Sequence, residues 1–543
     1  MTGRRRKVLK WIGIVAGALV IIAVALGIWV SSVIPPAQGT PITLNAELFK
    51  APAAPLPLDD RILYKSASEI AGMIRNKEAK SEEVVRALID RIKNENHNYN
   101  ALIWLREEEA IADAKRCDER IAAGDSLLPP LFGVPITIKE HYWVKGSPST
   151  MNAKMFGFIA PEDGPAVKAL KDAGAIILGT TNVPFMLSDY QTQGEVYPTA
   201  SNPYDTTRTP GGSTGGGAAA LAAGFTCAEL GSDLGGSIRV PSAFCGLWGL
   251  KSTCGAINMT QGASPDTVTK FTRFALASSG PLARVPEDLA LMWHALRNTP
   301  LDPKFQKPID RPAATTRTID QYRFAWMDEW PHGSAHVAVS VDVKKKLALL
   351  VDSLQKRGAQ VTKDVPDIYE DLQRVFLASF GGMMGEGQPW LLRKLMLMQM
   401  GGMAPTEELR GTFAEVLGDP SDTRWAETDK ERAELQGEWE RFFTKHDFII
   451  LPLSYGAAFK KCPQGSDLAG DNGAVVHYMD YVPYAYVINA TGNPTLSVPM
   501  GLNDEGLPIG LQIVGPQNSE EELLHLAMLL KPLVPGFIRP KGR

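Results

Sequence analysis

Residues 208–253 read RTPGGSTGGGAAALAAGFTCAELGSDLGGSIRVPSAFCGLWGLKST, and this stretch is the most informative part of the chain. It contains two serines that are each preceded by a pair of glycines, Ser213 and Ser237. Glycine lets the backbone turn sharply and lets successive N–H groups approach a ligand closely. The stretch therefore predicts an exposed hydroxyl beside backbone donors, an arrangement that can stabilise a developing oxyanion.

A serine nucleophile needs a base, and this stretch supplies no histidine for the task. The nucleophile-elbow pattern G-x-S-x-G is also absent around Ser237. Lys139 is the other candidate, because it ends the apolar run LFGVPITIK (131–139), which is typical of a short buried strand. Burial lowers the pKa of a lysine toward the range in which its amine is neutral and accepts a proton. His141, two residues further on, is interpreted as a wall or structural residue rather than a base.

Helical and strand patterns alternate along the rest of the chain. Residues 165–173 predict a helix that is closed by Gly174 and followed by a strand over 175–178. Residues 300–445 read as helical and polar, apart from one methionine-rich segment. The alternation predicts an α/β fold, with further strands at 448–451, 495–498 and 510–514.

These motifs together resemble the amidase signature family of serine hydrolases, over most of the chain from about Ser66 to Leu530. Residues 208–253 match the hallmark of that family. The resemblance also covers LFGVPITIK and the C-terminal pair NATGNPTLSVP (489–499) and GLPIGLQIV (506–514). It implies an α/β amidase signature fold, in which a central mixed, twisted β-sheet is covered by helices on both faces.

The resemblance implies an amidase with a Ser-Ser-Lys triad. Ser237 matches the nucleophile that forms the acyl-enzyme, and Lys139 matches the base. Ser213 matches the bridging serine, which the family holds in a cis peptide bond, here Gly212–Ser213. The implied reaction is hydrolysis of a carboxylic amide to an acid and an amine or ammonia.

The resemblance also implies which residues surround the triad. Asp233 and Arg239 match positions that brace the loop carrying the nucleophile. Thr214 stands where many members have a second consecutive serine, and it retains a hydroxyl. The backbone N–H groups implied to form the oxyanion hole are those of Leu234, Gly235, Gly236 and Ser237.

The first residues of the chain predict a membrane anchor. Basic residues between Arg4 and Lys10 precede an uncharged run from Trp11 to Ile34, and no further Lys or Arg follows until Lys50. A helix of about 20 residues spans roughly 30 Å, the hydrocarbon thickness of a bilayer. The charge asymmetry places the N-terminus in the cytoplasm and the rest of the chain across the membrane, periplasmic or extracytoplasmic. A cleaved signal peptide is the alternative, although its apolar core would be only about 7–15 residues long.

The sequence then predicts three regions. Residues 1–34 form the cytoplasmic basic tip and the transmembrane anchor, and residues 35–60 form a tether rich in Pro and Ala. Residues 61–535 form the catalytic domain, with a helical, methionine-rich insertion around 300–445.

Composition narrows the partners and cofactors. The 543 residues are 44% hydrophobic and 21% charged, which is typical of a globular protein, and the net charge of −4 argues against nucleic acid as a partner. The five cysteines form no C-x-x-C pair and the eight histidines show no H-E-x-x-H pattern, so we predict no metal and no cofactor. The partners expected are a small-molecule or lipid amide, the membrane and a second copy of the chain in a homodimer.

The substrate is the point on which the sequence leaves alternatives. Residues 376–403 are rich in methionine, which is common at adaptable apolar surfaces. Together with the anchor this segment resembles the membrane-bound fatty acid amide hydrolases, and Met396, Met400 and Trp390 then belong to an apolar cap. A buried core helix explains the same segment equally well. The alternative functions are a tethered peptide or aryl amidase and a glutaminyl amidotransferase A-type subunit, whereas the intact triad argues against a non-catalytic protein.

Overall fold

The computed structural model describes residues 42–259, 276–297, 299, 316–330, 339–385, 390, 393–394, 411, 414 and 422–541. The predicted anchor over residues 1–34, the start of the predicted tether, and Met396 and Met400 of the predicted cap lie outside these residues. Within the described part of the chain, no helix is long and apolar enough to cross a membrane.

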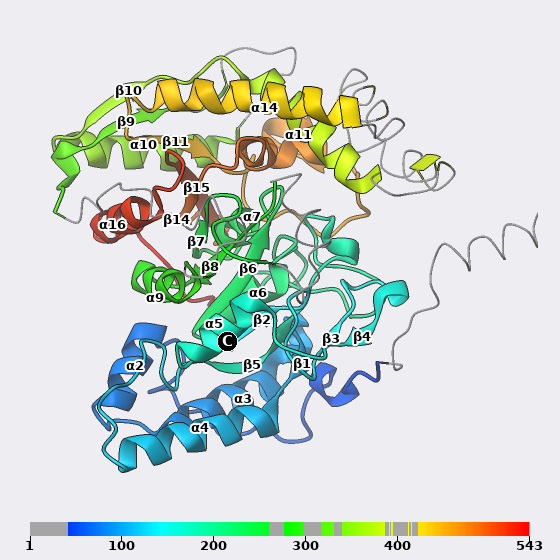
Figure 1. Ribbon diagram of the computed structural model, residues 1–543, viewed down its shortest axis with the longest axis vertical. Helices are drawn as coiled ribbons and strands as arrows, with labels where there is room; N and C mark the ends of the chain where they lie inside the picture. Colours follow the sequence, from blue (N-terminus) through cyan, green and yellow to red (C-terminus); the bar gives the residue numbers. More distant parts are fainter. Residues whose placement is uncertain are drawn as a thin grey trace, which may run out of the picture.

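A mixed sheet of eleven strands organises the fold (Figure 1). In spatial order the strands are β1 (Leu102–Leu105), β5 (Ile176–Thr181), β2 (Pro135–Lys139), β6 (Ala228–Asp233), β8 (Ser278–Ala283), β7 (Trp248–Lys251), β14 (Thr495–Leu502), β15 (Pro508–Val514), β11 (Phe448–Pro452), β9 (Arg323–Trp326) and β10 (Gln360–Lys363). Strand β2 runs parallel to β5 and β6, whereas β8 pairs antiparallel with β6 and β14 pairs antiparallel with β15. The predicted α/β fold with a central mixed sheet is confirmed.

Two short ribbons lie outside this sheet. Strand β3 (Pro148–Ser149) pairs with β4 (Phe158–Ile159), and β12 (Leu468–Ala469) pairs with β13 (Val475–Val476).

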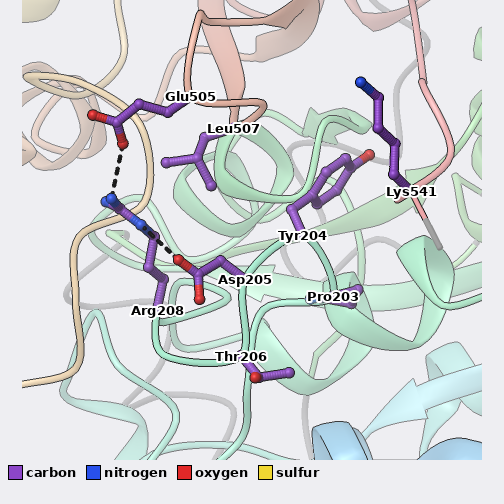
Figure 2. Close-up of a pocket in the computed structure, with 8 residues that line it drawn as sticks. All are labelled: Pro203, Tyr204, Asp205, Thr206, Arg208, Glu505, Leu507 and Lys541. Carbon is purple, nitrogen blue, oxygen red and sulfur yellow. Dashed lines mark hydrogen bonds and ion pairs between the residues drawn. The ribbon is translucent and has the colours of Figure 1, made fainter. Parts of the chain in front are cut away.

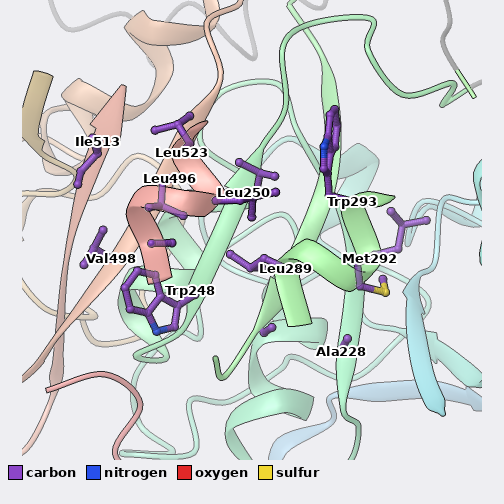
Figure 3. Close-up of a cluster of buried hydrophobic side chains, with 14 of the residues drawn as sticks. Ala228, Trp248, Leu250, Leu289, Met292, Trp293, Leu496, Val498, Ile513 and Leu523 are labelled. Carbon is purple, nitrogen blue, oxygen red and sulfur yellow. The ribbon is translucent and has the colours of Figure 1, made fainter. Parts of the chain in front are cut away.

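Helices cover both faces of the central sheet. On one face, α6 (Gly215–Ala222) packs with Leu282 of β8 and with Ile238 and Cys245, which flank α7 (Arg239–Phe244), in a small apolar cluster. Side chains alternate between the two faces of a strand, so Trp248 and Leu250 of β7 point to the opposite face. There they pack with α9 (Pro286–Leu296) and α16 (Glu520–Leu530) in the larger core (Figure 3).

The remaining helices lie toward the two ends of the sheet (Figure 1). Those nearest the β1 end are α2 (Ala67–Arg75), α3 (Ser81–Tyr99) and α4 (Glu107–Ala122), and those nearest the β10 end are α10 (Val341–Lys356), α11 (Tyr369–Gly385) and α14 (Asp422–Phe442). The predicted helix over 165–173 is α5 (Pro165–Asp172), and a single short turn, α15 (Pro483–Tyr486), precedes β14.

The prediction that residues 300–445 are helical is wrong at two places. Strands β9 and β10 lie within this region and pair with each other in parallel at the edge of the central sheet. Each strand has only four residues, and β10 (QVTK) is mostly exposed and polar. Such a strand shows no run of apolar residues, so sheet pairing rather than side-chain pattern determines its conformation.

The order of strands brings the predicted site together. Strands β2 and β6 are parallel neighbours, with Thr137 opposite Glu229 and Ile138 opposite Leu230. Every residue of both strands is buried. Since parallel strands end at the same edge of a sheet, Lys139 at the end of β2 lies at the same edge as Ser232 and Asp233 of β6, and its amine contacts Ser232.

Gly280 in β8 offers a test of how closely this strand packs against its neighbour β7. A Cβ atom added to Gly280 would lie 1.8 Å from the carbonyl oxygen of Leu250, which is backbone and has no room to move aside. We expect Gly280→Ala to lower the free energy of unfolding by about 3 kcal/mol, because overpacking of a core forces the backbone to shift. The measurement is the midpoint of thermal or urea unfolding.

The matched control is Gly72→Ala in α2, where an added Cβ meets no atom within 4 Å. That variant should be as stable as the unmodified chain or more stable, by up to about 1 kcal/mol, because alanine favours a helix. Equal unfolding midpoints for the two variants would contradict the packing described for β8.

Candidate active site

Lys139 is the most deeply buried member of the predicted triad. Its side chain is fully enclosed at the end of β2, as the apolar run before it predicts. The Nζ atom lies 2.7 Å from Ser213 Oγ and 3.0 Å from Ser232 Oγ, and it also donates to the Ser232 carbonyl oxygen at 3.3 Å. The amine is therefore directed at a serine hydroxyl and surrounded by uncharged oxygens.

The surroundings of Lys139 favour its neutral form. Burial lowers the pKa of Lys139 to about 7, against the opposing effect of the Asp233 and Glu229 carboxylates. A large fraction of this amine is therefore uncharged near neutral pH. A neutral amine at hydrogen-bond distance from a hydroxyl can act as a general base toward that hydroxyl.

The loop that carries Ser213 approaches other backbone segments very closely. The peptide bond between Gly212 and Ser213 is cis, as the family resemblance implies. A Cβ on Gly212 would lie 2.2 Å from the carbonyl oxygen of Asp189, so only glycine fits there. The next residue, Thr214, donates its N–H to the carbonyl oxygen of Ser237 at 3.2 Å. The two serine-bearing loops are thereby joined to each other.

Ser237 occupies a sharp turn between β6 and α7. Gly236 before it has a φ of 111°, and a Cβ there would lie 2.7 Å from Cβ of Ala485. Ser237 is 8% exposed, compared with 2% for Ser213 and 0% for Lys139. The hydroxyl group nearest to solvent is therefore the one predicted to attack a substrate, and the base lies at the buried end.

The oxyanion-hole expectation needs one correction. The Gly236 N–H donates to the Asp233 carboxylate at 2.8 Å, because this carboxylate closes the turn after β6 by accepting from Gly236 and Ile238. The N–H of Gly236 is therefore occupied. Among the residues that the structure describes, the N–H groups of Leu234, Gly235 and Ser237 have no such partner and stay available to an oxyanion.

A buried ion pair holds this turn in place. Arg239 donates two hydrogen bonds of 3.0 Å to the two oxygens of Asp233, and both side chains are fully buried. The guanidinium also donates to Gln512 at 2.8 Å and to Asn489 at 2.5 Å. Burial alone would raise the pKa of Asp233, but the charge and hydrogen bonds of Arg239 outweigh it and hold that pKa well below its usual range.

Comparisons with known proteins identify the family to which the chain belongs. The family model described as Amidase matches residues 83–524. The chain belongs to the amidase family. It is a hydrolase of amide carbon–nitrogen bonds, with the Ser-cisSer-Lys catalysis that is typical of the family.

Among curated relatives, this amidase is 31% identical to the glutamyl-tRNA(Gln) amidotransferase A subunit of Prochlorococcus marinus, over 84% of this chain and 94% of that one. It is 30% identical to the A 2 subunit of the same amidotransferase from Clostridium acetobutylicum, over 87% of this chain and 99% of that one.

Solved structures show the same fold. A bacterial aryl acylamidase superposes with a TM-score of 0.73 at 21% identity, covering 89% of this amidase and 100% of that chain. A fatty acid amide hydrolase superposes with a TM-score of 0.70 at 20% identity, covering 89% of this amidase and 87% of that chain.

Several residues of the site were not predicted from the sequence. Ser232 contacts Lys139, and the Tyr190 hydroxyl donates to the Gly235 carbonyl oxygen at 2.9 Å. Asn489 and Gln512 bind Arg239. Ser232 lies within the motif and could have been found as the residue before Asp233, and the two amides lie in blocks that match the family. No sequence signal identifies Tyr190.

The predicted apolar cap is only partly described. Helix α11 contains the first ten residues of the methionine-rich segment, and there Phe376 to Ser379 are buried. A ring atom of Phe376 lies 3.5 Å from the position of a Cβ on Gly235, so this helix packs against the oxyanion turn as core. Trp390, by contrast, is 63% exposed.

A polar surface pocket lies elsewhere in this amidase (Figure 2). It is lined by Pro203, Tyr204, Asp205, Thr206, Arg208, Glu505, Leu507 and Lys541, none of which belongs to the predicted site. Its arginine is already paired with Asp205 at 3.2 Å and with Glu505 at 2.9 Å.

Proposed function

We propose that this chain hydrolyses a carboxylic amide through an acyl-enzyme on Ser237, with Ser213 as the bridging serine and Lys139 as the base. One observation carries the proposal: the buried Lys139 amine lies 2.7 Å from Ser213 Oγ. A lysine with a pKa of about 7 is a suitable base for a reaction near neutral pH.

The reaction proceeds by proton relay. Neutral Lys139 accepts the proton of Ser213 while Ser213 accepts that of Ser237, whose oxygen attacks the amide carbonyl. The backbone donors of Leu234, Gly235 and Ser237 stabilise the resulting oxyanion. The proton returns through Ser213 to the leaving nitrogen, the carbon–nitrogen bond breaks, and water then releases the acid from Ser237.

A small amide is the substrate class that we propose, rather than a fatty acid amide. The curated relatives described above belong to amidotransferases, and the described start of the methionine-rich segment, in α11, has buried residues. The second candidate is therefore an amidotransferase A-type subunit. Rates for glutamine, an aryl amide, a peptide C-terminal amide and a long-chain fatty acid amide distinguish these functions. A preference for the long-chain amide would overturn the assignment of a small amide.

The nucleophile can be tested without knowledge of the substrate. An alkyl fluorophosphonate should label Ser237 covalently, and Ser237→Ala should lose both labelling and hydrolysis of a p-nitroanilide. Ser242 on α7 provides the matched control, because its hydroxyl is engaged with the Ile238 carbonyl oxygen at 2.8 Å. The Ser242→Ala variant should still be labelled. Labelling that persists in Ser237→Ala would refute the assignment.

The base predicts a pH dependence. Because Lys139 must be neutral, activity should fall as the pH drops through about 7. Lys139→Met should lower kcat/KM by about 10²–10⁴-fold and remove this acidic limb from the residual rate. Lys139→Arg should be equally inactive, because arginine keeps its proton. If either variant keeps the limb at its original pH, another group is the base.

We propose further that residues 11–34 anchor the enzyme as a single span, on the basis of their sequence alone. The full chain should then stay in the membrane fraction after a carbonate wash, and deletion of residues 1–36 should release an active enzyme. Protease added from the cytoplasmic side should spare the catalytic domain. Recovery of the uncleaved full chain in the soluble fraction would exclude an anchor.

A further inference from the structure

Glu229 is a fully buried carboxylate that has no part in the mechanism given above. It lies on β6, opposite Thr137 of the neighbouring strand β2. Thr137 is two residues before Lys139 on that strand. A buried charge is costly unless a partner compensates it. This costly carboxylate lies on the strand next to the one that carries the base.

The hydrogen bonds of Glu229 are incomplete. Its Oε1 atom accepts from the Thr181 hydroxyl at 2.7 Å, and Thr181 lies opposite Lys139 in the register of β5 and β2. The other oxygen, Oε2, is buried and has no hydrogen-bond partner in the described part of the chain. The Thr137 hydroxyl, on the residue opposite Glu229 in β2, also lowers the pKa of this carboxyl, so two threonine hydroxyls stabilise the carboxylate.

The space for this carboxylate is built into α6. A Cβ on Gly217 would lie 2.3 Å from the carboxyl carbon of Glu229 and 2.4 Å from Oε1. The helix sequence GGGAAALA supplies neither a charge nor a hydroxyl to the carboxylate. The third glycine of this helix therefore makes room for Glu229 without neutralising it.

Few charged or titratable groups of the described residues act on Glu229 and Lys139. Asp233 and Glu229 act on Lys139, and Lys139 in turn acts on the buried ring of His141. Among the described residues, the titratable groups that interact with Glu229 are Lys139 and the phenol of Tyr142. Burial holds the pKa of His141 far below its usual value, so its ring is neutral, and burial likewise keeps the Tyr142 phenol protonated. The Asp233 carboxylate forms a buried ion pair with Arg239.

We propose that Glu229 is a positioning residue of the active site, whose buried carboxylate acts on Lys139 and determines the pH range in which Lys139 accepts the proton of Ser213. This inference rests on the role of Lys139 given under the proposed function. Burial raises the pKa of Glu229 to about 7, which is also the pKa of Lys139, so the two groups gain and lose protons in the same range. An ionised Glu229 stabilises the ammonium form of Lys139 and delays the appearance of its neutral amine as the pH rises.

The test is the pH dependence of Ser237 labelling by an alkyl fluorophosphonate, measured as a first-order rate on the full chain between pH 5 and pH 9. Glu229→Gln removes the negative charge and keeps the shape of the side chain. Lys139 should then lose its proton at lower pH, and the acidic limb should move down by about one pH unit. A change in packing alone would lower the rate at every pH and leave the limb in place.

Three variants separate charge from packing. Glu229→Asp keeps a carboxylate and should restore the limb toward its original pH. Thr181→Val removes the donor to Oε1, which makes the neutral form of Glu229 more favourable, and should move the limb in the same direction by less. Glu520→Gln is the matched control, since this buried glutamate acts on Lys251 instead, and its limb should not move.

The outcomes distinguish this inference from the proposed function. If Lys139→Met keeps the acidic limb, the assignment of the base is wrong and the inference is lost with it. If Lys139→Met loses the limb but the Glu229→Gln limb stays at its original pH, only the role of Glu229 is overturned. Should Glu229→Gln fail to fold, an unmoved limb in Thr181→Val overturns it in the same way.

Discussion

The exclusion of water from the Lys139 amine is the constraint on which the rest of the active site depends. A lysine in water is protonated at neutral pH and cannot accept a proton. Lys139 becomes a base because it ends a strand that is buried on both sides, between β5 and β6 in the middle of one half of the sheet. The uncharged oxygens of Ser213 and Ser232 satisfy its hydrogens without stabilising a positive charge as a carboxylate would.

This constraint explains why the polypeptide approaches itself so closely around the site. A hydroxyl can reach a buried amine only if the loop that carries it is also buried, and a buried loop has little space for side chains. Gly212 lies against the backbone at Asp189, and Gly217 lies against the carboxylate of Glu229. The turn that carries Ser237 packs against Ala485 at Gly236, where a Cβ would have no space. The glycines of residues 208–253 thus allow close packing near the base as much as they allow sharp turns.

Lys139 and Ser213, which the structure brings to hydrogen-bond distance, share one property: each is defined by a local pattern. Lys139 follows an apolar run, and Ser213 follows a glycine pair, so the sequence near each of them carries the information. The occupied N–H of Gly236 was not predictable in this way, because it depends on the direction in which the Asp233 carboxylate turns. Tyr190 reaches Gly235 from a segment 45 residues away, and only the assembled fold brings them together. Strand β10 was missed because its pairing, and not its composition, makes it a strand, whereas β9 (RFAW) has an apolar run of only three residues.

Strand β6 carries two buried carboxylates, and their different environments give them different charge states near neutral pH. Asp233 has a guanidinium fully paired with it, so its charge is permanent and its task is to hold the turn that carries Ser237. Glu229 is stabilised by the hydroxyls of Thr181 and Thr137 and not by a guanidinium of its own within the described part of the chain, so its charge depends on pH and on the state of Lys139. If Glu229 had an arginine partner as well, its carboxylate would stay ionised, and the guanidinium would offset the effect of that charge on Lys139 at every pH. Without a cation of its own, this carboxylate gains and loses its proton in the same pH range as Lys139, and its charge in that range shifts the pH at which the buried amine becomes neutral.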